Sequence, residues 1–98
     1  MPVARFLEFA VPQAVQAGAS KDTEDLVEKT VQVLGTFVAT LAIQGTVDGS
    51  TWGDIQTDIT APGLVQIPGT FRAMRINVTA YVSGTPRALL GARDSRTR

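Results

Sequence analysis

The sequence predicts an all-β protein, a small antiparallel β-sandwich or jelly-roll-like domain with an N-terminal arm. Three observations indicate this class. Apolar and polar residues alternate along several segments, as they do when one face of a strand is buried. Turn residues interrupt the chain at intervals of about 8–12 positions, and no segment keeps a helical period of 3.6 residues. With 98 residues, the chain suits a single domain.

The segment 36–52 is expected to be the central unit of the sheet. Its core-facing residues are Phe37, Ala39, Leu41 and Ile43. The dipeptide Asp48-Gly49 follows, which favours a tight hairpin turn because Asp bonds its own backbone and Gly accepts a positive φ. We expect Trp52, just beyond this turn, to close one end of the sandwich. The alternative is an exposed ring that stacks on a sugar or anchors a partner.

The N-terminal residues 1–21 are predicted to form a strand or an arm. Residues 3–10 alternate loosely, and Pro2 and Pro12 bracket them too closely for a long helix. Residues 11–21 are small and polar, which indicates an extended arm or loop; the alternative is a short helix over residues 13–17. Small residues there would let the backbone lie close to another surface. Residues 3–10 could equally be one more strand of the sandwich.

The remaining strands are expected within a domain spanning residues 22–91. They are a short extended piece at 25–27, a turn, and strands at 29–34, 54–59, 64–67, 71–82 and 87–91. On the strand at 71–82, strict alternation places Met74, Ile76, Val78, Ala80 and Val82 in the core and Tyr81 on the opposite face. Residues 92–98 are polar and charged without a pattern, and they predict a flexible C-terminal tail.

Charge is balanced overall but unevenly distributed. Residues 1–58 carry eight acids and three bases, a net charge of −5, and residues 59–98 carry one acid and six arginines, a net charge of +5. We expect strands from the two halves to interleave in the fold, so that acidic and basic side chains mix on the surface. The alternative is an acidic and a basic face that meet between subunits. Three of the six arginines lie in the last six residues without interleaved aromatics, which argues against direct nucleic-acid binding.

Several kinds of chemistry are excluded by composition. The chain has no histidine and no cysteine, so Ser–His and Cys–His nucleophiles and imidazole or thiolate zinc sites cannot be built. Two acidic groups could hold calcium, Asp48 with Asp54 and Asp58, and Asp22 with Glu24 and Asp25. Turn formation and protection of strand edges explain these residues better. We therefore expect no enzymatic activity, no cofactor and no metal.

Two runs resemble a known family. Ala39–Ile55 and Gly69–Val78, with Lys29–Phe37 fitting the same pattern, look like the decoration, or cement, proteins of tailed-bacteriophage capsids. The resemblance implies a structural virion protein on the capsid exterior that bridges neighbouring capsid subunits. Its partners would be the major capsid protein and further copies of itself, as a homotrimer. The same runs also resemble galactose-binding-like jelly rolls, which implies a carbohydrate-binding module of a phage tail or host-recognition structure. A neck or tail accessory protein is a further alternative.

Candidate partner contacts come from the arm and from the outward faces of the strands. They are Arg5, Gln13, Gln16, Arg75, Tyr81 and Arg87. We expect residues 1–21 to touch the capsid shell or to cross to a neighbouring copy. The chain has no apolar run of about 20 residues and no signal-peptide pattern, so we expect no membrane contact and synthesis in the host cytoplasm.

Overall fold

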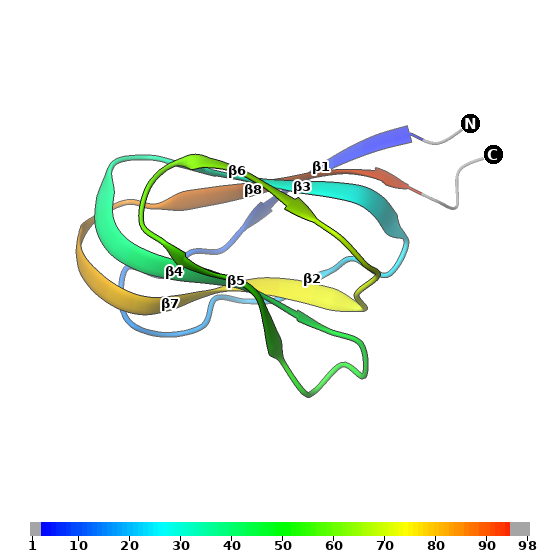
Figure 1. Cartoon of the computed structure of the whole chain (residues 1–98), viewed down its shortest axis with the longest axis horizontal. Coiled ribbons are helices and arrows are strands. Elements are labelled where there is room, and N and C mark those ends of the chain that lie inside the picture. The colour runs from blue at the N-terminus through cyan, green and yellow to red at the C-terminus, as the bar shows by residue number, and fades with distance from the viewer. Residues whose placement is uncertain (1–2, 95–98) are drawn as a thin grey trace.

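Two four-stranded antiparallel sheets pack face to face and confirm the predicted β-sandwich (Figure 1). The structure, a computed structural model, describes residues 3–94. Sheet A has the strand order β1-β8-β3-β6, and sheet B has the order β2-β7-β4-β5. The strands are β1 (Val3–Phe9), β2 (Lys21–Asp22), β3 (Leu26–Leu34), β4 (Phe37–Thr46), β5 (Gly53–Ile59), β6 (Gly63–Ile67), β7 (Ala73–Gly84) and β8 (Arg87–Asp94).

The chain changes sheet at every connection between these strands except the β4–β5 hairpin. The acidic first half and the basic second half therefore interleave. Among the described residues, a glutamate of the first half pairs with an arginine of the second in Glu8–Arg87 at 2.9 Å, Glu28–Arg93 at 2.8 Å and Glu24–Arg72 at 3.8 Å. These pairs confirm the prediction that acidic side chains of the first half and basic side chains of the second half mix on the protein surface.

The core lies between the sheets and is built around β4, as its alternation predicted. Leu41 and Ile43 have no exposed surface, and they belong to one buried cluster with their cross-strand partners on β7, Val78 and Ile76, and with residues of sheet A. Buried apolar side chains supply most of the free energy that favours folding. The core comprises Phe9, Leu26, Val31, Val33, Ala39, Leu41, Ile43, Ile59, Ile67, Met74, Ile76, Val78, Ala88, Leu90 and Ala92.

Residues 3–9 form a strand of the sandwich rather than an arm that reaches away from it. β1 pairs with β8 along its whole length, and Phe9 is only 2% exposed. The following segment then crosses to sheet B, where Gly18 N–H donates to the Ile76 carbonyl and the Gln16 carbonyl accepts from Val78 N–H. Residues 11–21 contain a bend at residues 13–16, where the alternative helix was expected, and Ala17 then pairs with Asn77. The N-terminal region is thus bonded to both sheets.

The C-terminal strand is longer than predicted. β8 continues to Asp94, and Ala92 is 7% exposed, because β1 and β3 pair with β8 on its two sides. The prediction of a tail is therefore wrong for residues 92–94, which belong to β8. The remaining residues of the predicted tail, 95–98, lie outside the described part of the chain.

Irregular pairing explains two further differences from simple alternation. In β3, Glu28 has a φ of 53° at a register shift, so the predicted short piece, turn and strand are one bulged strand. In β7, register shifts opposite β4 reverse the facing of the residues after Val78. Ala80 and Val82 are therefore exposed, and Tyr81 packs against the core. The predicted facing of these three residues was wrong.

Two corners that contain glycine lie in close backbone contact at one end of the sandwich. Gly35, between β3 and β4, has a φ of 99°, and Gly84, at the end of β7, has a φ of 93°. A Cβ on Gly84 would meet the Thr36 carbonyl oxygen, and a Cβ on Gly35 would meet the Thr85 carbonyl oxygen. Thr85 N–H donates to the Thr36 carbonyl at 2.9 Å. Both corners therefore need glycine for backbone conformation and for close approach.

Asp48 organises the β4–β5 turn, as its position predicted. Its Oδ1 accepts hydrogen bonds from the N–H groups of Ser50 and Thr51, at 2.8 and 2.7 Å, and from the Thr46 hydroxyl at 3.0 Å. These donors favour the ionised carboxylate, so they hold the pKa of Asp48 well below its ordinary value. The turn thereby fixes the loop that carries Trp52.

We predict that Asp48→Ala lowers the thermal unfolding midpoint at pH 7. Because the folded-state pKa of Asp48 is depressed, the stability it contributes is present above the unfolded pKa, near 3.9, and is lost as the pH falls toward the folded value. The difference between variant and wild type should therefore shrink when unfolding is followed by circular dichroism at pH 3. An equal difference at both pH values would contradict this role.

Candidate interaction surface

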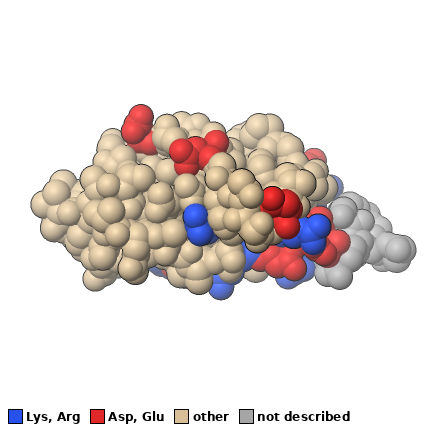
Figure 2. Space-filling model, turned by 90° about the horizontal axis from the view of Figure 1, so that it is seen from below, with Lys and Arg blue, Asp and Glu red and all other residues tan. Residues whose placement is uncertain are grey.

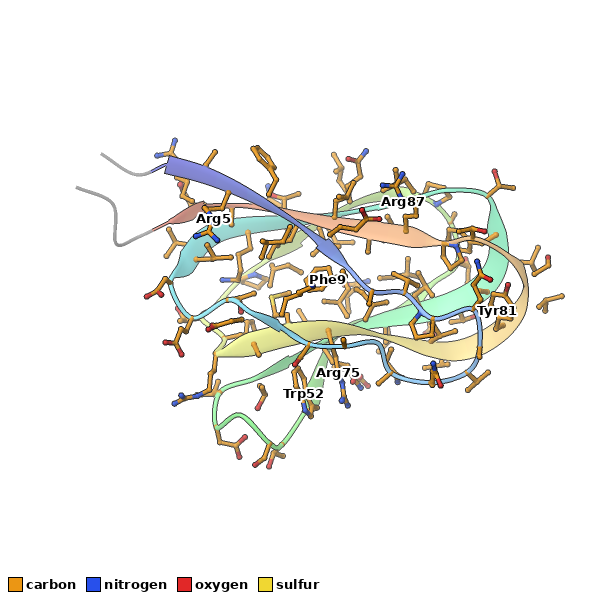
Figure 3. All side chains as sticks on the ribbon, turned by 180° about the vertical axis from the view of Figure 1, so that it is seen from behind. Arg5, Phe9, Trp52, Arg75, Tyr81 and Arg87 are labelled. Atoms are coloured by element: carbon orange, nitrogen blue, oxygen red, sulfur yellow. The ribbon has the colours of Figure 1, made fainter. Side chains whose placement is uncertain are left out.

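The six predicted contact residues do not form one patch. Figure 3 shows Arg5 near one end of the molecule, Tyr81 and Arg87 toward the other end, and Arg75 on the outer side of sheet B. Gln13 and Gln16 lie on the crossing segment between the sheets, both exposed. The contacts that these residues make inside the chain separate them further.

Two of them are engaged in exposed polar pairs. The Arg87 guanidinium donates to both carboxylate oxygens of Glu8, at 2.9 and 3.2 Å. This contact lowers the pKa of Glu8 and raises that of Arg87. The Gln13 amide donates to the Thr85 hydroxyl at 3.1 Å, which fastens the crossing segment to the β7–β8 corner. Both pairs hold one part of the sandwich to another.

The environments of Tyr81 and Trp52 are the reverse of those predicted. Tyr81 packs against the core, and its hydroxyl donates to the Gly84 carbonyl at 2.7 Å. Trp52 does not close the end of the sandwich, because its half-buried ring lies on the outer side of sheet B (Figure 3). Phe71 and Ile55 instead pack against the core near Gly45.

A row of polar side chains crosses the outer face of sheet B. Gln44 on β4 is the direct cross-strand partner of Arg75 on β7 and of Asp54 on β5. Arg75 Nε donates to the Gln44 amide oxygen at 2.8 Å, and the Gln44 amide nitrogen donates to Asp54 at 2.9 Å. The guanidinium carbon of Arg75 lies 4.3 Å from the centre of the Trp52 ring, which is a cation–π contact. The Arg75 head group is therefore held in place on two sides.

The outer face of sheet A is apolar at its centre. Phe6 is 77% exposed and Leu64 is 70% exposed, although they lie on opposite edge strands. Between them is a hollow of about 340 Å³, lined by Leu89 and Gly91 of β8 and by Thr30 and Gln32 of β3; most of its surface is apolar. The Phe6 ring lies over Gly91, where a Cβ would be 3.3 Å from the ring. The Glu8–Arg87 and Glu28–Arg93 pairs lie toward the two ends of β8. An apolar centre with a charged rim is typical of a protein interface.

Sheet B also exposes apolar residues at one end. Val82 is 74% exposed and Val38 is 57% exposed, and Val38 pairs with the residue after Val82. Figure 2 looks at the molecule from this side. The charged side chains gather over the half that holds the start of β1 and the end of β8, and the opposite end is largely uncharged. The two sheets thus carry apolar surfaces that face away from each other.

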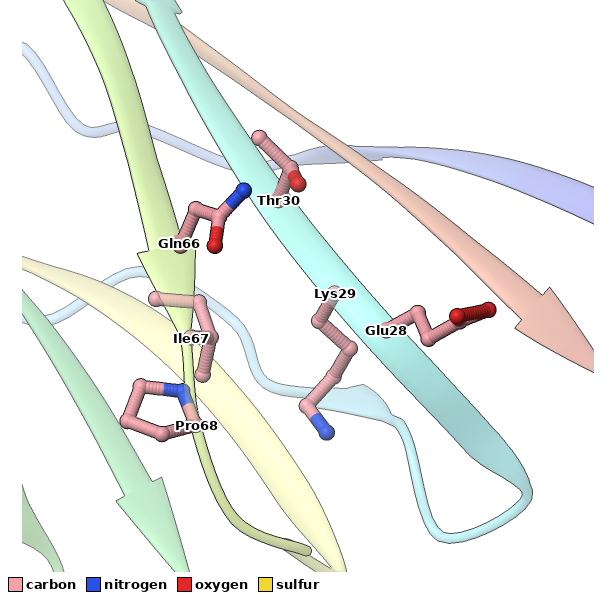
Figure 4. A pocket seen from close by; sticks show the side chains of 6 residues that line it. All are labelled: Glu28, Lys29, Thr30, Gln66, Ile67 and Pro68. Atoms are coloured by element: carbon pink, nitrogen blue, oxygen red, sulfur yellow. The ribbon is translucent and has the colours of Figure 1, made fainter.

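A buried lysine borders a separate hollow of about 540 Å³ between β3 and β6 (Figure 4). Lys29 is 3% exposed, and burial lowers its pKa. Its Nζ donates to the Gly69 carbonyl at 2.8 Å and to the Leu26 carbonyl at 3.4 Å. It therefore ties the bulge of β3 to the β6–β7 turn. The alternation of residues 29–34 places Lys29 on the same face as the buried Val31 and Val33, but the charge of its side chain argued against burial.

Within residues 3–94, no group of three or more acidic side chains is placed so that it could hold a metal ion. Over the same residues, no helix is long and apolar enough to cross a bilayer. Sequence reasoning selected Arg75 but missed its partners Gln44 and Asp54, as well as Phe6, Leu64 and Lys29. The outward position of Gln44 on the alternating strand was the available signal.

No family model and no curated protein matches the sequence. Among solved structures, the fold is similar to the crystal structure of SPBc2 prophage-derived protein YomS. The TM-score is 0.69, and the match covers 96% of this chain and 96% of that chain. With 11% sequence identity, the likeness is one of fold.

Proposed function

We propose that this chain is a structural, non-enzymatic phage protein that binds the exterior of the capsid and bridges neighbouring capsid subunits. Three observations support the proposal. The fold is similar to that of a prophage-derived protein along almost the whole chain. The sequence has no histidine or cysteine for nucleophilic catalysis. The outer faces of both sheets expose large apolar side chains.

The last of these observations carries the bridging function. A protein that bridges two neighbours needs two contact surfaces on one rigid body. The sandwich presents Phe6 and Leu64 on one side and Val38 and Val82 on the other. Exposed apolar groups of this kind mark interaction sites. The partners in this proposal are the major capsid protein and further copies of the chain, as a homotrimer.

A carbohydrate-binding role is less compatible with the geometry. Sugar stacking requires an open aromatic face, and one face of Trp52 is covered by the Arg75 guanidinium. The other polar aromatic, Tyr81, packs on the core and uses its hydroxyl within the chain. We therefore do not propose a sugar site.

Variants of the two apolar faces test the bridging function. Leu64→Lys and Val82→Lys should each weaken binding to capsids assembled without this protein by about tenfold or more, because each places a charge in an apolar contact. Each should also abolish the increase in the temperature of capsid disruption that the wild-type protein provides. Binding is measured by co-sedimentation and disruption by release of packaged DNA.

Ser50→Lys is the matched control, since it adds the same charge in the exposed β4–β5 turn, away from both faces. It should behave as wild type. Wild-type protein that does not sediment with capsids would contradict the proposal. Full stabilisation by both face variants would contradict it as well.

A further inference from the structure

Arg75 differs from three other arginines of the described residues in the groups that its side chain contacts. Arg72, Arg87 and Arg93 each have a glutamate carboxylate within 3.8 Å or less. Over residues 3–94, Arg75 contacts the Gln44 amide and the Trp52 ring but no carboxylate. A guanidinium has five N–H donors, and the bond to Gln44 uses the one on Nε. The two terminal nitrogens, which form the fork that grips a carboxylate, make no hydrogen bond within this part of the chain.

The Arg75 head group is also fixed before any partner binds. The centre of the Trp52 ring lies 4.3 Å from the guanidinium carbon, and Gln44, the cross-strand partner of Arg75, accepts a hydrogen bond from Nε. Asp54 accepts from the Gln44 amide nitrogen, so the amide oxygen is the atom turned toward Arg75. A head group held in this way loses little conformational entropy on binding. Tryptophan and arginine are also the residue types most enriched at the energetic centres of protein interfaces.

We infer that Arg75 and Trp52 form a receptor for a single carboxylate, which takes the side chain of a glutamate or aspartate of a partner protein. The planar guanidinium of Arg75 would donate two parallel hydrogen bonds to the carboxylate oxygens. The inference rests on the proposed function only for the identity of that partner, and it adds a polar contact on sheet B, toward the opposite end of β4 from Val38 and Val82.

The surroundings favour one carboxylate over a polyanion. Asp54 lies in the same cross-strand row, and Asp48 lies in the turn that carries Trp52. Nucleic-acid binding depends on several cations that contact successive phosphates. Figure 2 shows acidic as well as basic side chains on this side of the molecule. A single carboxylate directed at Arg75 avoids the repulsion that an extended phosphate backbone would meet.

Trp52 allows a direct test because it is the one tryptophan of the chain. Its fluorescence is followed while the capped tripeptide acetyl-Gly-Glu-Gly-amide is added at constant ionic strength. We expect a saturable change in emission with this peptide and none with its Gln counterpart. Arg75→Lys keeps the charge but loses the planar fork, and it should weaken the peptide's apparent affinity roughly tenfold. Arg87→Lys, at an arginine already bonded to Glu8, should leave the affinity unchanged.

A second measurement needs no variant. The affinity of the wild-type protein for the Glu peptide should fall as the pH drops through the peptide's carboxyl pKa, about 4.3. Equal responses to the Glu and Gln peptides, or an unchanged affinity in Arg75→Lys, would overturn the inference. A stronger response to a short DNA duplex than to the Glu peptide would overturn it in favour of nucleic acid. Because no capsid is present, these outcomes are independent of whether the protein binds capsids.

Discussion

Replacing Phe9 by alanine is expected to lower the free energy of unfolding by about 3–5 kcal/mol. Phe9 is 2% exposed and belongs to the core, at the end of a strand that pairs with β8 along its whole length. Loss of the ring removes a large apolar contact and leaves a cavity that the surrounding strands fill only in part. A domain of this size has a total stability of about 5–15 kcal/mol, so the variant loses a large share of it. Urea denaturation measures the change.

Phe6→Ala is the matched control for this experiment. Phe6 lies on the same strand, but its side chain is 77% exposed on the outer face of sheet A. We expect its effect on stability to stay within about 0.5 kcal/mol. If residues 1–21 were a detachable arm, Phe9→Ala would be as mild as Phe6→Ala. Equal effects would therefore contradict the place of β1 in the sandwich.

Leu41→Ala is expected to lower the free energy of unfolding by about 2–5 kcal/mol. Leu41 has no exposed surface and lies at the middle of β4, which pairs with β5 on one side and β7 on the other. The cavity would therefore open between the two sheets, where few side chains can move to fill it. Denaturant midpoints of wild type and variant, compared at an unchanged slope, give the difference.

Val38→Ala, on the same strand, provides the comparison. Val38 is 57% exposed and points away from the core, so its truncation should change stability by less than about 0.5 kcal/mol. A large effect at Val38 together with a small effect at Leu41 would show that Val38, and not Leu41, faces the core.

Alternation identified β4 correctly because the residues inserted at its register shifts lie on its partners β5 and β7, so that β4 itself alternates with one face toward the core. The same rule failed in β7, where the pairing with β4 shifts register on both sides of Ala80. Each inserted residue reverses the facing of everything beyond it. No residue type in that segment marks the insertion, so Tyr81 was assigned to the wrong face. Its packing is a consequence of the pairing between strands, which local sequence does not determine.

The candidate site was predictable only in part for a similar reason. Arg75 could be selected as an outward-facing cation, but its contacts depend on the register of β4 with both neighbours. Trp52 was assigned to the core because a tryptophan after a hairpin often closes a sandwich. Here Phe71 and Ile55 approach Gly45, and Trp52 lies over Arg75. Which aromatic side chain fills a given space is decided by tertiary packing.

The most direct test of the bridging proposal is a cryo-electron microscopy map of the phage capsid to which the proposal assigns this chain. The proposal predicts density for the sandwich on the outside of the shell. The sheet A face around Phe6 and Leu64 should lie on one subunit, and the sheet B face around Val38 and Val82 on its neighbour. A shell without this density, or contact through one face alone, would contradict it.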